Sequence, residues 1–586
     1  MRPARWIFPT PDSASESRLV RELGINPITA RVLVRRGFSD PASAQAFLQP
    51  SLDDLHDPLL MAGMEAARER LLRAIAAREP ILICGDYDVD GTVSVVVLKK
   101  AIEMAGGAAD FHVPHRLRDG YGVRPEVVEE AAARGIRLIV TVDTGIRATA
   151  VVRAARELGI DVIVTDHHLP EDELPPAIAV LNPNRRDCEY PEKNLCGAGV
   201  VFKLVQSLIS RLDFDIARRR RVLESFLRMV AIATVADVVP LSGENRIIVK
   251  HGLAGLRGAR NHGLRALLDI AGFGAARAPS SSEVAFRIAP RINAAGRMAS
   301  ATDVIELFLT EDEARAREIA GRLHELNKDR QDTEADIVRQ VLEECARQPI
   351  GDGQAALVFC GRDWHRGVVG IVASRLVERF CRPVFVLSED GERNLAEGSG
   401  RSIPDFHLLD ALESMSDLFT RFGGHRQAAG LGLPIERVAQ FRDRLNEYAC
   451  ARLTPEQFRP TLELDGMVAI DEITDTAIND LMALAPFGMG NPAPVFALLR
   501  AESALRPNVM KEKHVRAFLR QNGRTVSATG WNLGERAGEM AQGSTLDAAI
   551  AFEQDQFARS QGWGEWGIVL KDVRPACAAA TPGATR

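Results

Sequence analysis

Three aspartates occupy alternate positions in the stretch CGDYDVDG, which covers residues 84–91. In an extended chain alternate side chains point the same way, so Asp86, Asp88 and Asp90 would share one side of a strand that ends near Gly91. Carboxylates held this close repel each other and raise one another's pKa unless a cation lies between them. The spacing therefore indicates a divalent-metal site, and the alternative is an acidic turn with a solvated face.

Two further motifs contain metal-ligand residue types. VDTG (142–145) contributes Asp143, and TDHH (165–168) contributes His167 and His168. Each has a structural alternative, because an aspartate at the end of a strand can also form a turn or cap the next helix. Their joint occurrence with the first motif favours a metal site.

The surrounding pattern explains how these motifs could meet. Apolar runs at 80–84, 137–142 and 160–165 are typical of buried strands, and the segments 124–135 and 147–159 have helical spacing and end in glycine. This β-α-β-α order predicts an α/β fold with a parallel sheet. Ligands bind at the carboxyl ends of such strands, so we expect the acids and histidines to lie together at that edge.

The expected donor set favours particular ions and a particular reaction. Carboxylates with one or two imidazoles suit Mn²⁺ or Mg²⁺ better than zinc. Two such ions a few ångströms apart can clamp a phosphate and activate water for in-line attack. The sequence therefore predicts a phosphodiesterase or phosphatase.

Bulk composition excludes several other classes. With 46% hydrophobic and 26% charged residues, the 586-residue chain is neither disordered nor fibrous, and its length predicts several domains. A net charge of −6 argues against a surface coated in positive charge but leaves local clefts open. The eight cysteines form no C-x₂-C pair, which favours a reducing cytoplasm. We expect no signal peptide and no membrane span.

Changes of pattern along the chain predict its domain organisation. A charged amphipathic stretch at 311–347 would form a helix about 50 Å long, suited to joining two lobes. A second α/β region follows, with glycine-rich turns expected at 398–400 and 423–424, and short strands after about 458 predict a small β-barrel. The expected parts are an N-terminal segment (1–60), a catalytic domain (61–310), the connecting helix (311–347), a second α/β domain (348–455), the barrel (456–575) and a tail (576–586).

Together, DYDVDG (86–91), VDTG (142–145), TDHH (165–168) and ATVADVVPL (233–241) resemble the DHH phosphoesterase superfamily. Further stretches resemble its RecJ-type branch of single-strand-specific 5′-to-3′ DNA exonucleases, from about residue 60 onward. They are HRLRDGYG (115–122), PRINAAGRM (290–298), WHRGVVGIVASR (364–375), GSGRS (398–402), GGHRQAAG (423–430) and PFGMGNPAP (486–494). The resemblance implies a parallel-sheet DHH domain, a DHH-associated α/β domain and a C-terminal OB-like barrel.

The resemblance also assigns a metal centre. It implies that two ions are held by Asp88, Asp90, Asp143, His167 and Asp237, and that Asp86 and His168 complete or support the cluster. We expect Asp88, Asp90, His167 and His168 to be catalytic and Asp86 to be a further ligand. Asp237 is assigned to the metal centre by the resemblance alone. Its alternative interpretation is an aspartate at the end of a helix. Cys84 replaces a metal-binding histidine of the related pyrophosphatases, which favours the exonuclease branch.

Substrate contacts follow from the same resemblance. Arg116, Ser399 and Arg401 match positions that recognise the 5′ end of the strand, where guanidinium groups can grip a phosphate. The GGH turn would present free N–H groups and an imidazole to phosphates. The alternative to substrate binding is a solvated position on a helix surface for the arginines, and a packing role for His365. The expected substrate-binding residues are Arg116, Arg291, Arg297, His365, Arg375, Ser399, Arg401, Gly423, Gly424 and His425.

The function implied is hydrolysis of single-stranded DNA from its 5′ end to 5′-mononucleotides, in DNA repair and recombination. Expected partners are a single-strand-binding protein and a helicase, and the protein is expected to be a cytoplasmic monomer. Two alternatives remain open: a nano-RNase or oligonucleotide phosphatase with the same chemistry, and a catalytically inactive DNA-binding relative. The barrel argues against the first, and the intact acids at the metal positions argue against the second.

Overall fold

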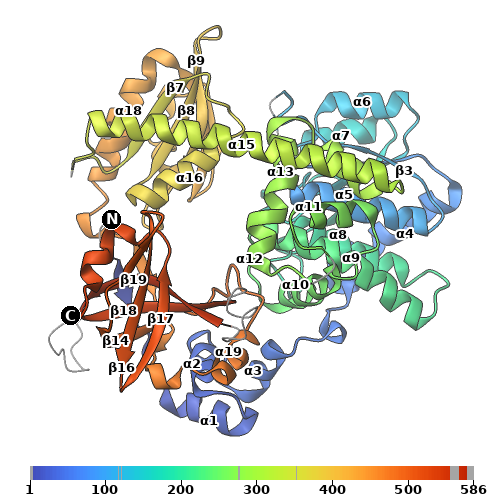
Figure 1. Cartoon of the computed structure of the whole chain (residues 1–586). Coiled ribbons are helices and arrows are strands. Elements are labelled where there is room, and N and C mark those ends of the chain that lie inside the picture. The colour runs from blue at the N-terminus through green and yellow to red at the C-terminus, as the bar shows by residue number, and fades with distance from the viewer. Residues whose placement is uncertain are drawn as a thin grey trace. The chain divides into compact units, whose positions relative to one another are not determined.

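A computed structural model describes residues 4–116, 118–120, 122–274, 277–351, 353–554 and 566–576 (Figure 1). The chain forms two compact units. The larger comprises residues 51–454 with 488–490, and the smaller comprises residues 1–50, 455–487 and 491–586. Among the described residues, no helix combines the length and the apolar character needed to cross a membrane.

The first sheet of the larger unit is entirely parallel, as predicted. Its strands run in the order β3-β2-β4-β5-β6. All residues of β2 and β4 are buried, because helices cover both faces of the sheet. The strands are β2 (Ile81–Gly85), β3 (Ala109–His112), β4 (Leu138–Val142), β5 (Asp161–Thr165) and β6 (Ala179–Leu181).

Alternation along these strands separates two cores. Ile83, Val140 and Ile163 pack with the apolar residues of α4, α5 and α8. Their neighbours, including Leu82 and Ile139, pack with α6 and α7. The helices of this domain are α4 (Met64–Ala77), α5 (Val89–Met104), α6 (Pro125–Ala133), α7 (Thr149–Glu157), α8 (Gly197–Ile209), α9 (Ile216–Ala236), α10 (Gly243–Leu256), α11 (His262–Ile270), α12 (Ser281–Glu283), α13 (Ala289–Met298) and α14 (Thr302–Leu309).

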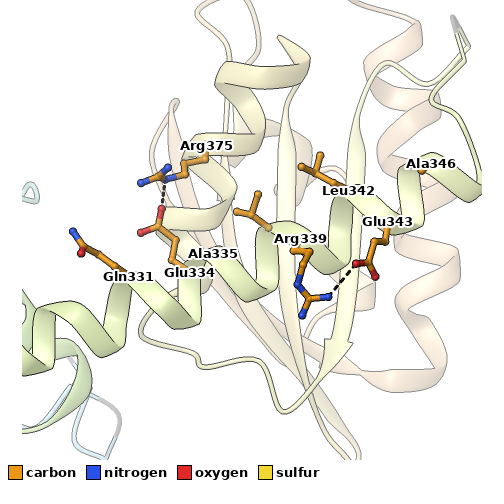
Figure 2. A pocket seen from close by; sticks show the side chains of 9 residues that line it. Gln331, Glu334, Ala335, Arg339, Leu342, Glu343, Ala346 and Arg375 are labelled. Atoms are coloured by element: carbon orange, nitrogen blue, oxygen red, sulfur yellow. Dashed lines mark hydrogen bonds and ion pairs between the residues drawn. The ribbon is translucent and has the colours of Figure 1, made fainter. Parts of the chain in front are cut away.

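One uninterrupted helix, α15 (Glu313–Arg347), leads from this domain to the second sheet (Figure 1). Its 35 residues correspond to a length of about 52 Å. Its buried stripe changes partners along the way, since Ile319 and Leu323 belong to the first core and Ile337 and Val341 to the core of the second sheet. Near its middle, Arg375 of α16 (Val369–Phe380) forms an ion pair with Glu334 of α15 (Figure 2).

The second sheet is mixed, with the order β10-β11-β9-β8-β7. The predicted glycine turns at 398–400 and 423–424 are wrong, because these residues lie in strands β9 and β10. The glycines allow close packing: a Cβ on Gly398 would lie 2.0 Å from the carbonyl oxygen of Val386. The elements are β7 (Leu357–Arg362), β8 (Val384–Asp390), β9 (Leu395–Arg401), β10 (Arg421–Gly424), β11 (Ala428–Pro434), α17 (Leu408–Glu413) and α18 (Val438–Cys450).

The smaller unit contains the predicted OB-like barrel. Strand β14 pairs with both β18 and β16, which closes a five-stranded barrel in the order β14-β18-β19-β17-β16. The N-terminal helices α1 (Ser13–Leu23), α2 (Pro27–Arg35) and α3 (Pro41–Leu48) contribute to the same core. The other elements are β1 (Arg5–Ile7), β12 (Thr461–Glu463), β13 (Gly466–Met467), α19 (Asp475–Met482), β14 (Phe496–Ser503), β15 (Asn508–Met510), β16 (His514–Gln521), β17 (Arg524–Gly530), β18 (Thr545–Gln554) and β19 (Trp566–Pro575).

Candidate active site

The carboxyl ends of three neighbouring strands supply the acids. In register, Gly85 of β2 lies beside Val142 of β4, which lies beside Thr165 of β5. The next residues along the chain are Asp86, Asp143 and Asp166. Parallel pairing of these strands therefore brings together three aspartates that are far apart in the sequence.

The DYDVDG segment differs from the predicted extended strand. Strand β2 ends at Gly85 and helix α5 begins at Val89, with Asp88 as its N-cap. Oδ1 of Asp88 accepts a hydrogen bond of 3.0 Å from the N–H of Gly91. Aspartate caps helices well, and the positive end of the helix favours Asp90 in its first turn. The acids therefore converge through a strand-to-helix turn rather than through alternation along a strand.

Helix α8 fixes the carboxylate of Asp90, which is 2% exposed. Its two oxygens accept hydrogen bonds from the N–H groups of Gly197 (2.6 Å) and Ala198 (2.8 Å) at the start of α8. A Cβ on Gly197 would lie 2.6 Å from the Cβ of Asp143, so only glycine fits there. The first turn of α8 thus positions one acid and makes room for another.

Two residues at the site have left-handed backbone conformations. Asp143 has φ 58°, and Val238, which follows Asp237 at the end of α9, has φ 61°. This conformation is costly for a residue with a Cβ, and most of all for a β-branched residue. Strain of this kind is typical of functional sites, where surrounding contacts hold the backbone in place.

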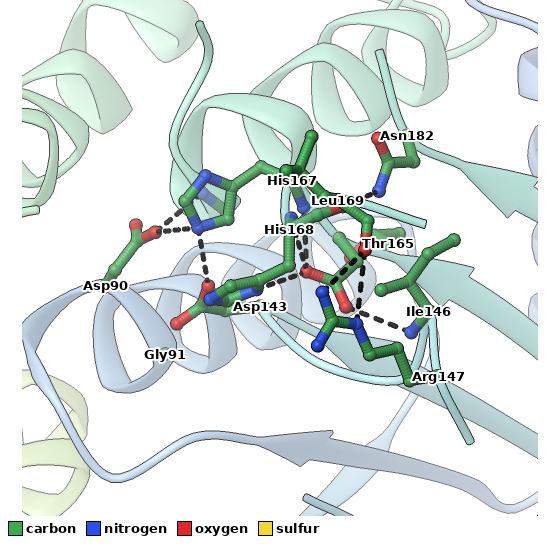
Figure 3. Close-up of polar contacts among 12 residues, drawn as sticks. Asp90, Gly91, Asp143, Ile146, Arg147, Thr165, His167, His168, Leu169 and Asn182 are labelled. Carbon is green, nitrogen blue, oxygen red and sulfur yellow. Dashed lines mark hydrogen bonds and ion pairs between the residues drawn. The ribbon is translucent and has the colours of Figure 1, made fainter. Parts of the chain in front are cut away.

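The two histidines of TDHH have different surroundings (Figure 3). Nε2 of His167 points into the acid cluster, 3.3 Å from Oδ1 of Asp143, 3.7 Å from Oδ2 of Asp237 and 3.8 Å from Oδ2 of Asp90. Burial lowers the pKa of His167, which favours the neutral ring that a metal requires. Nδ1 of His168 lies 2.7 Å from the carboxylate of Asp166. Burial opposes a charged ring, but this hydrogen bond raises the pKa of His168.

Asp166 was not among the residues predicted to act at the site. Its carboxylate also accepts hydrogen bonds from the N–H groups of Ile146 (3.0 Å) and His167 (2.8 Å). It thereby fixes the loop that carries both histidines, as carboxylates beside metal-binding histidines commonly do. Its position at a strand end directly before the two histidines was the available signal.

The structure brings together all six predicted metal ligands and His168. Three groups have ligand atoms within 4.8 Å of one another. Asp143 and His167 each belong to two of them, so the groups form one continuous cluster. The groups are Asp86, Asp88 and Asp143; Asp90, His167 and Asp237; and Asp143, His167 and His168.

The electrostatics of the cluster fit divalent cations. Burial and the charge of Asp88 raise the pKa of Asp86 to about 8, and burial with the charges of Asp90 and Asp88 raises that of Asp237 to about 9. Among the described residues, Oδ1 of Asp86, Oδ2 of Asp237 and Nε2 of His167 are buried without a hydrogen-bond partner. A set of oxygen donors with imidazole is the kind that Mn²⁺ and Mg²⁺ accept.

A hollow of about 440 Å³ lies within the larger unit. It is lined by the loop between β2 and α5 (residues 86–88, the acid loop) and by the second sheet. Tyr87, between two of the acids in sequence, lines it, and the guanidinium of Arg116 lies 4.9 Å from the centre of the Tyr87 ring. Ser399 and Gly423 line it from the second sheet. The structure thus gathers three predicted substrate-binding residues, Arg116, Ser399 and Gly423, beside the acids.

The remaining arginines of this hollow share one carboxylate. Glu397 of β9 pairs with Arg366, at 2.7 Å, and with Arg421. Arg401 lies next to Ser399 against α16, where burial and the charge of Arg116 lower the pKa of Arg401.

Gly424 follows Gly423 in β10, which is the edge strand of the second sheet. In an edge strand, alternate N–H groups are not paired within the sheet. His425, the next residue, is exposed.

Arg297 and His365 meet at the junction between α13 and the loop before α16. Arg297 donates a hydrogen bond of 3.2 Å to the carbonyl of Gly367, whose N–H donates to Nδ1 of His365 at 3.2 Å. Burial and the nearby Arg116 lower the pKa of Arg297 to about 10. An anion would stabilise both arginines by compensating their charge.

Two further predicted substrate residues, Arg291 and Arg375, line other pockets. Nε of Arg291 donates a hydrogen bond of 3.2 Å to Nδ1 of His324 on α15, and Arg291 lines a different pocket. Arg375 lines a third hollow along α15, beside Glu334. The structure does not bring these two arginines together with Arg116.

Family models match three stretches of the chain. Residues 80–234 match the N-terminal domain of the DHH family, residues 352–450 match the DHHA1 domain, and residues 464–563 match the RecJ OB domain. These stretches include the acid cluster except Asp237, all the strands of the second sheet and most of the barrel.

Known proteins resemble the whole architecture. The single-stranded-DNA-specific exonuclease RecJ of Bacillus subtilis (strain 168) is 39% identical over 546 residues, covering 92% of this chain and 67% of that protein. The crystal structure of Thermus thermophilus RecJ with Mn²⁺ matches with a TM-score of 0.83 and 30% identity, over 99% of this chain and 81% of that chain. The Mg²⁺ complex of the same protein matches with a TM-score of 0.77 and 29% identity, over 99% and 80%.

Proposed function

We propose that this chain, which belongs to the RecJ family of DHH phosphoesterases, is a metal-dependent exonuclease that releases 5′-mononucleotides from the 5′ end of single-stranded DNA. The observation that carries the proposal is the adjacency of two sites of opposite charge. Tyr87 lies between Asp86 and Asp88 of the acid cluster in sequence, and it also lines the arginine-lined hollow. A cleavable phosphate at the first site and a terminal phosphate at the second would define a fixed distance from the strand end.

The metal ligands in this proposal are Asp86, Asp88, Asp90, Asp143, His167 and Asp237. Two Mn²⁺ or Mg²⁺ ions bound there would polarise the scissile phosphate and lower the pKa of water. The chain's own contribution is to hold the acids ready: α8 orients Asp90, the cap of α5 orients Asp88, and burial keeps His167 neutral. His168, held at Nδ1 by Asp166, would present Nε2–H to a phosphate oxygen.

End recognition would come from the hollow. In the described structure Arg116 has no carboxylate partner, and the face of Tyr87 supports its guanidinium. It is therefore available to grip a 5′-terminal phosphate together with Ser399 and Arg401. Gly423, Gly424 and His425 could add N–H donors from the edge strand. Arg297 and His365 would hold the backbone between the two sites.

The cellular role is inferred from the family resemblance. We infer that the enzyme acts in DNA repair and recombination in the cytoplasm as a monomer, on strands exposed by a helicase and coated by a single-strand-binding protein. The OB-like barrel would add affinity for the strand, since such folds combine charged grooves with aromatic stacking.

A digestion of end-labelled DNA tests the proposal. Single strands labelled at the 5′ or the 3′ end are incubated with the full chain and Mn²⁺, Mg²⁺ or EDTA. We expect immediate loss of the 5′ label as mononucleotide, slow shortening of 3′-labelled strands, and no reaction in EDTA. Early release of the 3′ label, or activity in EDTA, would contradict the proposal.

Two controls separate the alternatives. Asp88→Asn should abolish digestion, whereas Asp172→Asn, at a surface acid whose side chain is 89% exposed, should not. Activity on oligonucleotides of a few residues with none on long strands would instead favour an oligonucleotide phosphatase. Full strand binding without any cleavage would favour a DNA-binding relative that lacks activity.

A further inference from the structure

Helices α11 and α13 both contact α15 (Figure 1). Residues of these helices and of the segments next to them line a second basic pocket, which shares no residue with the acid cluster. Its volume is about 420 Å³, within the range of about 300 to 1,000 Å³ that is usual for small-ligand sites. The described residues that line it include four basic groups and no carboxylate. The lining is Ile270, Ala271, Gly272, Phe286, Arg287, Arg291, His324, Asn327, Lys328 and Gln331.

An exposed aromatic ring forms part of this pocket. Phe286 is 78% exposed, although more than half of the phenylalanines in the described part of the chain are buried. It belongs to one π-helical turn, Val284–Ile288, inserted directly before α13. Such turns are rare and often occur at functional sites. An exposed ring beside basic groups is the arrangement on which a nucleic-acid base can stack.

The basic groups are not equally available. Arg287 is already compensated, because it donates to the carbonyl of Ala271 at 2.5 Å and lies 3.5 Å from Glu283. Lys328 has no carboxylate partner in the described structure. Arg291 contacts the Arg287 carbonyl and His324, and burial together with the charge of Arg287 lowers its pKa. Arg291 and Lys328 therefore retain positive charge that a bound anion would neutralise.

Helix α13 connects this pocket to the acid loop. Oδ1 of Asn293 accepts a hydrogen bond of 3.3 Å from the N–H of Val89, and a Cβ on Gly296 would lie 2.4 Å from the carbonyl oxygen of Tyr87. Phe286 and Gly296 are ten positions apart, which corresponds to about 15 Å along a helix. The pocket is thus separate from the acids but within reach of the same strand.

We propose that this pocket binds a nucleoside phosphate, with its base against Phe286 and its phosphate at Arg291 and Lys328. The class of ligand rests on the proposed function. The nucleotide could belong to a strand whose end occupies the acid cluster, or it could be a free mononucleotide such as the product. Both sources present the same base and phosphate to the pocket.

Binding measurements on the full chain in EDTA test the pocket without cleavage. The probes are 3′-labelled single strands of 4 and 30 nucleotides, followed by fluorescence anisotropy, and dAMP, followed by calorimetry. Phe286→Ala should weaken binding of the occupant by about 5- to 100-fold, the usual effect of removing one stacking ring. Lys328→Ala should lower the slope of log affinity against log salt by about 0.7, as expected for one lost phosphate contact to a single strand.

Matched variants control for general effects. Ile216→Ala removes another exposed apolar side chain of the same unit, one that is 84% exposed. Arg317→Ala removes another exposed basic group of α15, whose side chain is 69% exposed. Neither should change affinity or salt slope. Thermal unfolding of all four variants should match the wild type, because each removed side chain is exposed.

The outcomes separate the two sources and the two proposals. Loss of affinity for the 30-nucleotide strand alone identifies a strand as the occupant, and loss of dAMP binding identifies a free nucleotide. Wild-type affinity and salt slope in both pocket variants would overturn the proposed pocket. Failure of the wild type to digest single strands would overturn the proposed function instead, and the dAMP titration would still test the pocket.

Discussion

The two sheets of the larger unit gather opposite charges. The parallel sheet directs Asp86, Asp143 and Asp166 from its strand ends, whereas the mixed sheet carries Arg401 and Arg421 on β9 and β10. Each set of charges is unfavourable without a counter-charge. Burial and neighbouring like charges raise the pKa of Asp86 and lower the pKa of Arg401. In the proposed complex, a metal-bound phosphate chain would supply the missing charge to both. The difference in charge is what we would expect if the two sites are complementary halves of one binding surface.

The two halves are also held by different means. The acids are fixed by backbone groups, such as the N–H groups of Gly197 and Gly91. The arginines are held by other side chains, namely Glu397 and the ring of Tyr87. We therefore expect small changes at the acid site to have large effects and changes in the hollow to have graded effects.

The largest effect is expected at the acid site. Asp88→Ala removes a proposed metal ligand and the cap of α5. The kcat/KM for single-stranded DNA should therefore fall by more than about 100-fold, beyond the usual cost of losing an outer hydrogen-bond partner. Steady-state digestion at saturating Mn²⁺ measures this. The exposed Asp172→Ala is the control, and a fall of less than tenfold would show that the two sheets do not differ in sensitivity as described.

The next effect concerns Asp166, an acid that is not among the proposed metal ligands. Asp166→Asn weakens the hydrogen bond to His168 and the support of the histidine loop, so the Mn²⁺ concentration for half-maximal activity should rise by about 10- to 100-fold. Activity at saturating Mn²⁺ should largely recover. An unchanged Mn²⁺ requirement would mean that the backbone alone positions the histidines.

In the arginine-lined hollow the expected effect is smaller. Arg116→Ala removes one charged donor, so the KM for 5′-phosphorylated strands should rise by about tenfold, whereas the KM for 5′-hydroxyl strands should change little. Arg118→Ala, at an exposed arginine two residues away, is the matched control. Equal changes for both strand types would assign Arg116 to the strand backbone rather than to its end.

The raised pKa values of the acids predict how stability depends on pH. Because burial raises the pKa of Asp86 to about 8 and of Asp237 to about 9, the protonated forms stabilise the folded chain. That stabilisation is complete below the ordinary pKa of 3.8 and is lost as the pH rises toward 9. In EDTA the free energy of unfolding should fall by at least about 1 kcal/mol between pH 5 and 9, and Mn²⁺ should remove most of the fall. Parallel curves with and without Mn²⁺ would contradict the role of the metal.

The smallest effect tests the helix that joins the sheets. Gly321 lies in the interior of α15, and no atom lies within 4 Å of the position a Cβ would take. Gly321→Ala should raise the free energy of unfolding by about 0.5–1 kcal/mol, measured by denaturant titration. If activity falls while stability rises, bending of α15 contributes to bringing the two sheets together during turnover.

Much of the fold followed from local pattern. The apolar runs that end at Cys84, Val142 and Thr165 specified parallel strands, and their order placed the acids at one edge. The glycines at 398–400 were misassigned to a turn, because sequence does not reveal which glycines serve close packing of strands. The extended form expected for residues 86–91 was also wrong, since the capping preference of Asp88 prevailed.

The residues of the acid cluster were harder to predict from the sequence than the strands of the parallel sheet. Asp237 lies 94 positions beyond Asp143 at the end of an apolar helix, and only the family resemblance indicated it. Gly197 and Ala198, which hold Asp90, belong to a helix whose docking depends on tertiary packing. Spacing reveals residues that share one element, but it does not reveal a helix that arrives from elsewhere in the chain.

The first turn of α8 has a practical consequence for redesign. An engineer who transfers the aspartates and histidines to another α/β scaffold would obtain the ligands without their support. Asp90 would lack its two N–H donors, and any side chain at the position of Gly197 would displace Asp143. The smallest transferable part is therefore the set of three strand ends together with the start of α8.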